Sequence, residues 1–150
     1  MKIYLATDHA GFDLKEQIKD YLLQQKYEVE DCGAFSFEKN DDYPLFIAKA
    51  AEKVSEDPNS RGIIFGKSGA GEEITANKLK NVRAIIGFND ENVKLSREHN
   101  DANILSLGSE FLTFEKAKEL VKIFLTTPFS NDVRHKRRLD EIAEIEKNQE

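Results

Sequence analysis

The feature that most constrains the fold is an apolar run followed by a glycine-rich turn and a helix-forming segment. Residues 62–65 read Gly-Ile-Ile-Phe, which is typical of a buried strand in a parallel sheet. Residues 66–72 continue as Gly-Lys-Ser-Gly-Ala-Gly-Glu, and residues 73–79 are predicted to form a helix. Glycines let backbone N–H groups approach a ligand closely, and a helix N-terminus adds positive partial charge. Residues 66–72 are therefore predicted to form an anion cradle.

Glu72 lies at the mouth of this cradle. A carboxylate at this position makes sense if it removes a proton from a bound molecule. The loop then holds the anion that this proton transfer creates. In the alternative interpretation, the negative charges of Glu72 and its neighbour Glu73 only stabilise the N-terminus of the helix, by about 0.3–1 kcal/mol. A tight turn without a ligand is a further alternative. No Lys-Ser or Lys-Thr follows Gly71, so the segment departs from the phosphate-loop motif, and it also departs from the dinucleotide-binding fingerprint.

The rest of the chain alternates between strand and helix patterns. Strands are predicted at residues 2–7, 27–31, 62–65, 83–87 and 103–108, and helices at 12–25, 43–54, 73–79, 89–98, 114–125 and 131–147. This order predicts a Rossmann-like α/β sandwich of three layers, with a five-stranded parallel sheet covered on both faces. The connection at residues 32–42 is long and is therefore predicted to be functional. The last helix has a sparse apolar stripe, so it is predicted to pack on a partner subunit.

Composition bounds the class of protein. The 150 residues are 39% hydrophobic and 33% charged, which fits a single globular domain spanning residues 1–150. The net charge of -6 argues against general nucleic-acid binding. Cys32 is the one cysteine, so an internal disulfide is excluded. No apolar stretch approaches the roughly 20 residues of a membrane helix, and the N-terminus turns polar too early for a signal peptide. We expect a cytoplasmic protein without membrane contact.

Several polar clusters are candidates for chemistry, because ligands of such sheets bind outside the carboxyl ends of the strands. Asp8-His9 follows the first strand, whereas His99-Asn100 precedes the fifth and is expected to reach a site from a neighbouring subunit. Arg134 and Arg138 are four residues apart, so they share a helix face and can clamp one phosphate. A capping role for Asp8, a helix-end histidine and a solvated basic patch remain open as alternatives.

Five motifs in this order resemble the type B ribose-5-phosphate isomerase and galactose-6-phosphate isomerase family. They are Ala6-Thr7-Asp8-His9-Ala10-Gly11, Asp42-Tyr43-Pro44, residues 66–72 with Ala76-Asn77-Lys78, the run 96–103, and Arg134-His135 with Arg138. The resemblance covers essentially the whole chain. It implies a homodimer, sometimes paired into a tetramer, with sites built from residues of both subunits. It also implies aldose–ketose isomerisation of a sugar phosphate without a metal or cofactor.

The resemblance implies specific roles. Glu72 is the base that moves a proton between C1 and C2, His99 opens the sugar ring with Asp8 assisting, and Ser68 assists proton transfer to the oxygens. The implied substrate-binding residues are His9, Arg134 and Arg138 at the phosphate, Tyr43 and Asn100 at the sugar, and the backbone of Lys67, Ser68, Gly69, Ala70 and Gly71 at the enediolate.

Three positions distinguish this chain within the pattern. Gly66 stands where some members carry a cysteine base, which matches the branch that uses a glutamate at Glu72. Lys67 replaces a usual glycine, and Glu110 replaces a usual phosphate-contacting arginine. One hypothesis is that Lys67 supplies the missing cation while paired to Glu110. The alternatives are a shift to a hexose 6-phosphate substrate and a catalytically silent phosphosugar-binding module.

Overall fold

The computed structural model describes residues 1–149, which form a parallel sheet with helices on both faces. The strands are β1 (Lys2–Thr7), β2 (Glu28–Asp31), β3 (Arg61–Gly66), β4 (Ala84–Ile86) and β5 (Ile104–Gly108). The helices are α1 (Phe12–Gln24), α2 (Tyr43–Glu56), α3 (Ala70–Ala76), α4 (Asp90–Asn100), α5 (Phe114–Thr126) and α6 (Val133–Lys147). All neighbouring strands are parallel, in the order β2-β1-β3-β5-β4. The predicted fold class is therefore confirmed.

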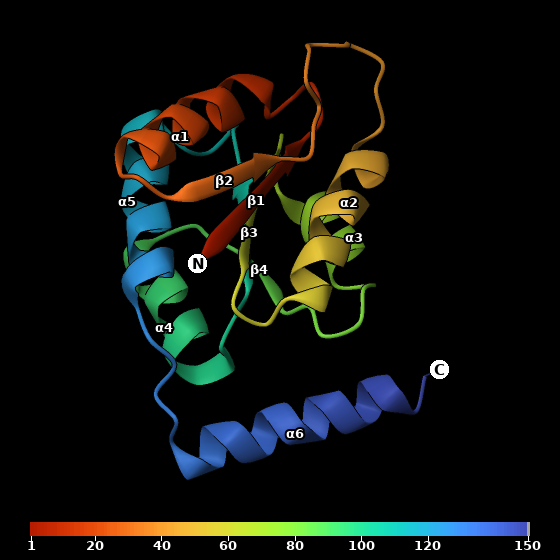
Figure 1. Cartoon of the computed structure of the whole chain (residues 1–150), viewed down its shortest axis with the longest axis vertical. Coiled ribbons are helices and arrows are strands. Elements are labelled where there is room, and N and C mark those ends of the chain that lie inside the picture. Colours follow the sequence, from red (N-terminus) through yellow and green to blue (C-terminus); the bar gives the residue numbers. More distant parts are fainter. Residues whose placement is uncertain (150) are drawn as a thin grey trace.

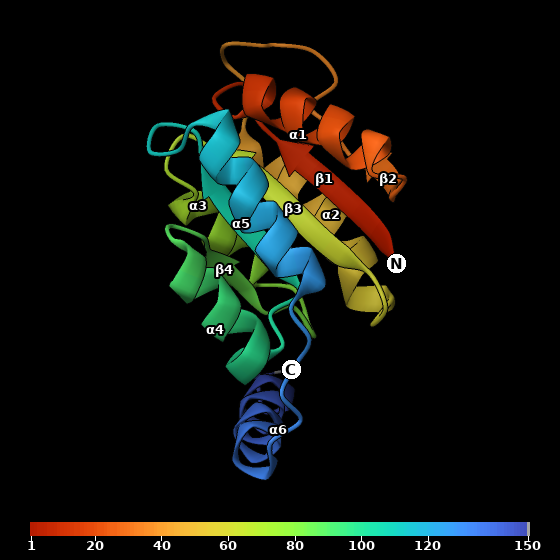
Figure 2. The same ribbon diagram turned by 90° about the vertical axis from the view of Figure 1, so that its left-hand side faces the viewer.

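Two hydrophobic clusters hold the helices against the sheet. Helices α1, α4 and α5 cover one face, and α2 and α3 cover the other (Figure 1, Figure 2). In α1 the buried apolar residues Leu14, Ile18 and Leu22 recur every four positions, so they form one stripe that faces the sheet. Strand β3 lies between β1 and β5 and is fully buried beyond its first residue. Because β1, β3 and β5 are central, their carboxyl ends define the middle of one edge of the sheet.

Several element boundaries differ from the prediction by a few residues, and two of these differences affect functional residues. The helix after the cradle begins at Ala70 and not at residue 73, because Gly69 adopts a left-handed backbone with φ of 86° and serves as the N-cap. Glu72 therefore lies in the first helical turn. Helix α4 continues to Asn100 and ends at Asp101, which is also left-handed. His99 and Asn100 consequently belong to its last turn and not to the connecting segment.

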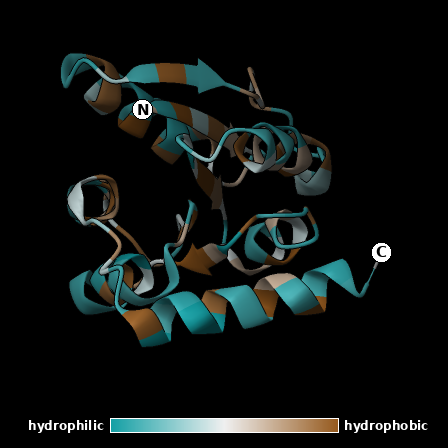
Figure 3. Ribbon diagram, turned by 60° about the horizontal axis from the view of Figure 1, so that its bottom comes forward, coloured by the Kyte–Doolittle hydropathy of each residue, from teal (hydrophilic) through white to brown (hydrophobic). Residues whose placement is uncertain are grey.

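Helix α6 lies outside both hydrophobic clusters. It packs on α4, and its far end is tied to the body by a hydrogen bond from the Asn81 N–H to Glu146 Oε1 at 2.9 Å. His135 is its one buried residue, whereas Val133 and Ile145 are 78% and 62% exposed. Figure 3 shows α6 as largely hydrophilic with isolated hydrophobic bands. Its packing on a partner subunit stays a prediction. Among residues 1–149, no helix has the length and apolar character needed to cross a membrane.

Candidate active site

Hydrogen bonds join the loops that follow β1, β3 and β5 at the carboxyl edge of the sheet. Thr7 Oγ1 donates to the Phe65 carbonyl at 3.1 Å. The Ser109 N–H donates to the Gly66 carbonyl at 2.8 Å, and Ser109 Oγ donates to the Ala10 carbonyl at the same distance. Asp8-His9, the cradle and the residues after Gly108 are thus brought together. The meeting of Asp8-His9 with the cradle is the convergence predicted from the sequence.

The cradle is held in a defined conformation by the neighbouring strand and by α2. Ser106 Oγ, on β5, donates to the Gly69 carbonyl at 2.7 Å and so supports the left-handed turn. The ring of Tyr43, at the start of α2, lies against Gly71, where an added Cβ would be 2.5 Å from the Tyr43 hydroxyl oxygen. Ser68 is exposed, and its Oγ accepts the Ala70 N–H at 3.2 Å. The structure therefore places Tyr43 and Ser68 at the cradle.

The carboxyl group of Glu72 is folded back onto the end of β3. The residue is 4% exposed, and a Cβ at Gly66 would lie 1.6 Å from Glu72 Oε1. Burial raises the pKa of Glu72 above its ordinary value, and the charge of Asp8 acts in the same direction, while a backbone N–H opposes the shift. A carboxylate with a raised pKa is suited to accept a proton from carbon near neutral pH.

The raised pKa predicts a pH-dependent stability difference between the natural chain and Glu72→Gln. The folded state holds the Glu72 proton more tightly than the unfolded state, so this contribution is fully present below the ordinary pKa of 4.5. It is lost as pH rises through the raised folded-state pKa. Urea unfolding from pH 4 to 8 should therefore show Glu72→Gln gaining stability relative to the natural chain as pH increases. The exposed Glu38→Gln is the control, and equal pH profiles for Glu72→Gln and the natural chain would contradict the burial effect.

Asp41 contacts a candidate site residue, His9, and the sequence did not indicate this contact. Its Oδ1 lies 2.7 Å from His9 Nδ1 and accepts the His9 backbone N–H at 3.0 Å. The only sequence signal was the length of the 32–42 connection, which does not single out one residue. Asp8, His9 and Asp41 place potential metal-ligating atoms within 4.8 Å of one another. Hydrogen bonds already engage His9 Nδ1, and Asp8 Oδ1 accepts the Ala10 N–H at 3.0 Å, so contacts within the chain account for this cluster.

The predicted pairing of Lys67 with Glu110 is wrong. Both residues are exposed, and their side chains form no ion pair within residues 1–149. They are joined through the backbone instead, since the Glu110 N–H donates to the Lys67 carbonyl at 3.0 Å. Exposed side chains are positioned by local solvent and rotamer preferences, which spacing along the sequence does not fix.

The remaining predicted residues lie at the opposite end of the sheet. Ile104 pairs with Gly62 and Gly108 with Gly66, so the start of β5 is about 13 Å from its cradle end. His99 and Asn100 precede that start, and the His99 ring stacks on His135 of α6 with centroids 4.3 Å apart. Arg134 and Arg138 are exposed on α6, which lies beyond the amino ends of the strands (Figure 1). One copy of the chain does not bring these four residues to the cradle.

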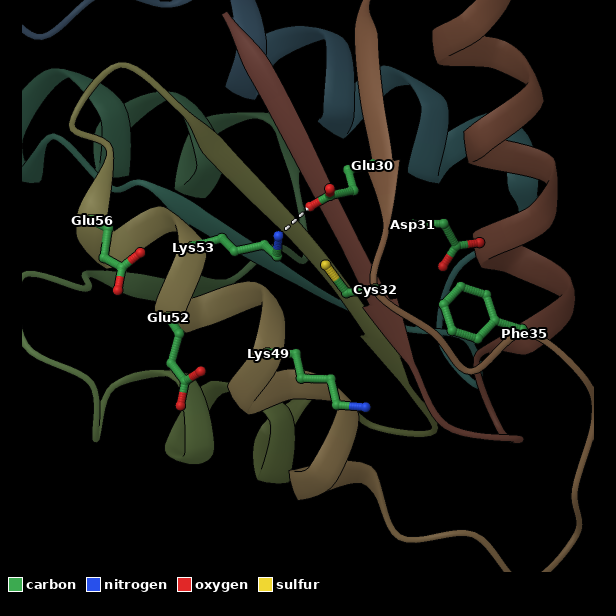
Figure 4. Close-up of a pocket in the computed structure, with 8 residues that line it drawn as sticks. All are labelled: Glu30, Asp31, Cys32, Phe35, Lys49, Glu52, Lys53 and Glu56. Atoms are coloured by element: carbon green, nitrogen blue, oxygen red, sulfur yellow. Dashed lines mark ion pairs between the residues drawn. The ribbon is translucent and has the colours of Figure 1, made fainter.

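A separate cavity of about 490 Å³ lies between β2 and α2 (Figure 4). It is lined by Glu30, Asp31, Cys32, Phe35, Lys49, Glu52, Lys53 and Glu56, none of which was predicted as a site residue. Lys53 Nζ pairs with Glu30 Oε2 at 2.8 Å across it. Burial raises the pKa of Cys32 to about 11, so its thiol stays protonated at neutral pH. Cys32 is thus a packing residue.

The fold and the carboxyl-edge site together define a class of protein. A parallel α/β sheet carries at its carboxyl edge a buried carboxylate beside a backbone cradle, which suits an enzyme that moves a proton next to a carbonyl group. A sequence model described as Ribose/Galactose Isomerase matches residues 3–142. The chain belongs to the ribose/galactose isomerase family.

Full-length relatives agree with this assignment. Ribose-5-phosphate isomerase B of Mycolicibacterium paratuberculosis is 45% identical over 147 residues, which cover 98% of this chain and 92% of the relative. The structure of ribose-5-phosphate isomerase B from Mycoplasma genitalium with bound ribulose-5-phosphate has a TM-score of 0.94 and 37% identity, and the match covers 97% of this chain and 96% of that one. The Clostridium thermocellum enzyme of the same name has a TM-score of 0.94 at 40% identity, with 100% of both chains covered.

Proposed function

We propose that this chain interconverts ribose 5-phosphate and ribulose 5-phosphate by proton transfer through an enediolate, without a metal, in one catalytic domain spanning residues 1–150. The observation that carries the proposal is the buried Glu72 carboxylate lying on Gly66 beside the cradle. Curated relatives that match over nearly the full chain are named ribose-5-phosphate isomerase B. A reducing, cytoplasmic setting is part of the proposal and rests on the single, buried cysteine.

In the proposed reaction Glu72 removes the C2 proton of the open-chain aldose. The electron pair of that C–H bond forms the C1–C2 double bond, and the carbonyl oxygen on C1 becomes an oxyanion held by backbone N–H groups of residues 67–71. Glu72 then delivers its proton to C1, while the C2 hydroxyl loses its proton and becomes the ketose carbonyl. Ser68 assists transfer between the two oxygens, and His99 with Asp8 opens the sugar ring beforehand.

The proposed site needs two copies of the chain. His99, Asn100, Arg134 and Arg138 lie at the far end of the sheet from the cradle of their own copy, so a second copy must supply them. We place them in a homodimer in which His9 of one copy and the two arginines of the other hold the phosphate, and pairs of dimers can form a tetramer. The exposed apolar residues Val133, Ile142 and Ile145 of α6 fit a helix that packs on a partner.

Site sharing predicts complementation between two inactive variants. Glu72→Gln removes the proposed base beside the cradle. His99→Asn removes the ring-opening group that each copy is proposed to supply to the site of its partner. After denaturation and refolding of an equal mixture, half of the dimers are hybrids with one intact site, so activity should return to roughly a quarter of the natural level. Each variant refolded alone is the control. A mixture no more active than the separate variants would contradict site sharing.

Glu110 favours a second candidate substrate, because it places a carboxylate where the family pattern has a phosphate-contacting arginine. A hexose 6-phosphate isomerase keeps the same proton chemistry with a longer sugar. Comparing kcat/KM for ribose 5-phosphate and galactose 6-phosphate tests the choice, and we expect ribose 5-phosphate to be preferred. A higher kcat/KM for galactose 6-phosphate would show that the hexose is the substrate. Tight binding of both sugar phosphates without turnover would indicate a silent phosphosugar-binding module.

A further inference from the structure

We infer that Asp41 is a positioning residue that orients His9 toward the phosphate of the substrate, an inference that rests on the phosphate-binding role of His9 in the proposed function. One oxygen of Asp41, Oδ1, contacts both the ring and the backbone of His9, at 2.7 Å and 3.0 Å. Two contacts on one residue restrict its ring rotation as well as its place in the loop. When Nδ1–H donates to a carboxylate, the histidine presents Nε2 to its ligand, and the tautomer is fixed.

The His9 ring also meets the ring of Phe37 from the same connection. The two rings lie edge to face with centroids 6.0 Å apart. The His9 side chain remains 32% exposed, whereas that of Asp41 is 10% exposed. The 32–42 connection therefore contacts the imidazole through both an aromatic ring and a carboxylate, and part of the His9 side chain stays exposed.

The connection that carries Asp41 is itself anchored at both ends. At its start, the Thr7 N–H donates to the Gly33 carbonyl at 2.8 Å, and the Ala34 N–H donates to the Thr7 carbonyl at 2.9 Å. Lys15 is fully buried, pairs with Asp31 at 2.8 Å and also donates to the Ala34 carbonyl. At its end, the connection runs directly into α2, whose first residue lies against the cradle. Asp41 is thus presented by a segment fixed to both β1 and the cradle.

The two oxygens of Asp41 differ in their surroundings. Asp41 Oδ2 is buried and has no hydrogen-bond partner within residues 1–149, so the hydrogen bonds of this carboxylate run through Oδ1 to His9. Asp8 adds a second carboxylate to the same cluster. Oδ1 of Asp41 is therefore the atom that orients His9.

The test compares Asp41→Asn with Glu38→Gln, which removes the same charge from an exposed residue of the same connection. Calorimetry gives the Kd of inorganic phosphate, and steady-state kinetics gives KM and kcat for ribose 5-phosphate. We expect Asp41→Asn to raise both the phosphate Kd and KM roughly tenfold or more, with kcat within about twofold, because a charge-assisted contact acts on binding. Glu38→Gln should leave all three values unchanged, and thermal melting verifies that both variants fold.

A second background separates positioning from a general effect of charge. In His9→Ala, which should itself weaken phosphate binding, adding Asp41→Asn is expected to change the phosphate Kd by less than about twofold. An equal loss in both backgrounds, an unchanged Kd in Asp41→Asn, or a matching loss in Glu38→Gln would overturn the inference. The phosphate measurement does not require turnover, so an inactive natural chain would refute the proposed function while this comparison still decides the role of Asp41.

Discussion

Glu72→Gln is expected to lower kcat for ribose 5-phosphate by roughly 10³-fold, which lies within the range of about 10²–10⁴-fold that a general base contributes. The amide keeps the size of the side chain and its place over Gly66, but it has no basicity with which to take a proton from C2. Because the substrate contacts survive, KM should change by less than about threefold. Steady-state assays of product formation check both values.

Glu73→Gln is the matched control, since it makes the same change one position along α3. Glu73 Oε1 accepts the Ile86 N–H at 3.2 Å and thus serves the packing of α3 on β4. An amide oxygen can accept the same hydrogen bond, so kcat should stay within about twofold of the natural chain. If Glu73→Gln were the inactive variant and Glu72→Gln the active one, the assignment of the base would be wrong.

Gly66→Ala is expected to lower kcat by about 10²-fold or more while the chain still folds, because a displacement of about 1 Å in a catalytic group can cost that much. The added methyl group would lie 1.6 Å from Glu72 Oε1 and 2.1 Å from Glu72 Cδ, so the carboxylate must leave its present position. A side chain at position 66 and the carboxylate of Glu72 therefore compete for one space. Kinetic assays alongside thermal melting measure the effect.

Gly62→Ala separates loss of the carboxylate position from the general cost of a methyl group in β3. Its Cβ would lie 3.0 Å from Ile104 Cγ1, a side-chain atom that can shift, and no site residue is near it. We expect this variant to lose some stability and to keep its kcat. Full activity in Gly66→Ala would show that Glu72 works from another position than the one observed.

Local patterns were sufficient to predict the fold. The apolar run before Gly66 predicts a buried central strand, and alternation with helical segments predicts the parallel sheet, because each pattern follows from how one element buries its side chains. The start of α3 was placed three residues late. The helix begins within the turn because Gly69 adopts the left-handed conformation. The turn contains three glycines, and the sequence alone does not show which of them adopts it.

Only those residues of the candidate site that come directly after the end of a strand could be predicted from the sequence. Asp8, His9 and the cradle meet because parallel strands bring their carboxyl ends to one edge. Asp41 was missed because its contact with His9 spans 32 residues and depends on the path of an irregular connection. The prediction of a Lys67–Glu110 ion pair was wrong because both side chains are exposed and can adopt many rotamers. In the proposed function, the place of His99 relative to the cradle is set by a second copy of the chain, and the sequence pattern gives only its position before β5.

The central claim is best tested by following ribose 5-phosphate and the purified, EDTA-treated protein in deuterium oxide by proton NMR. The account predicts that ribulose 5-phosphate forms and that deuterium from the solvent enters C1, because the proton held by Glu72 exchanges during the lifetime of the enediolate. Glu72→Gln should show neither event. No conversion by folded protein would contradict the proposed function, and conversion with deuterium at C1 in Glu72→Gln equal to that in the natural chain would contradict Glu72 as the base.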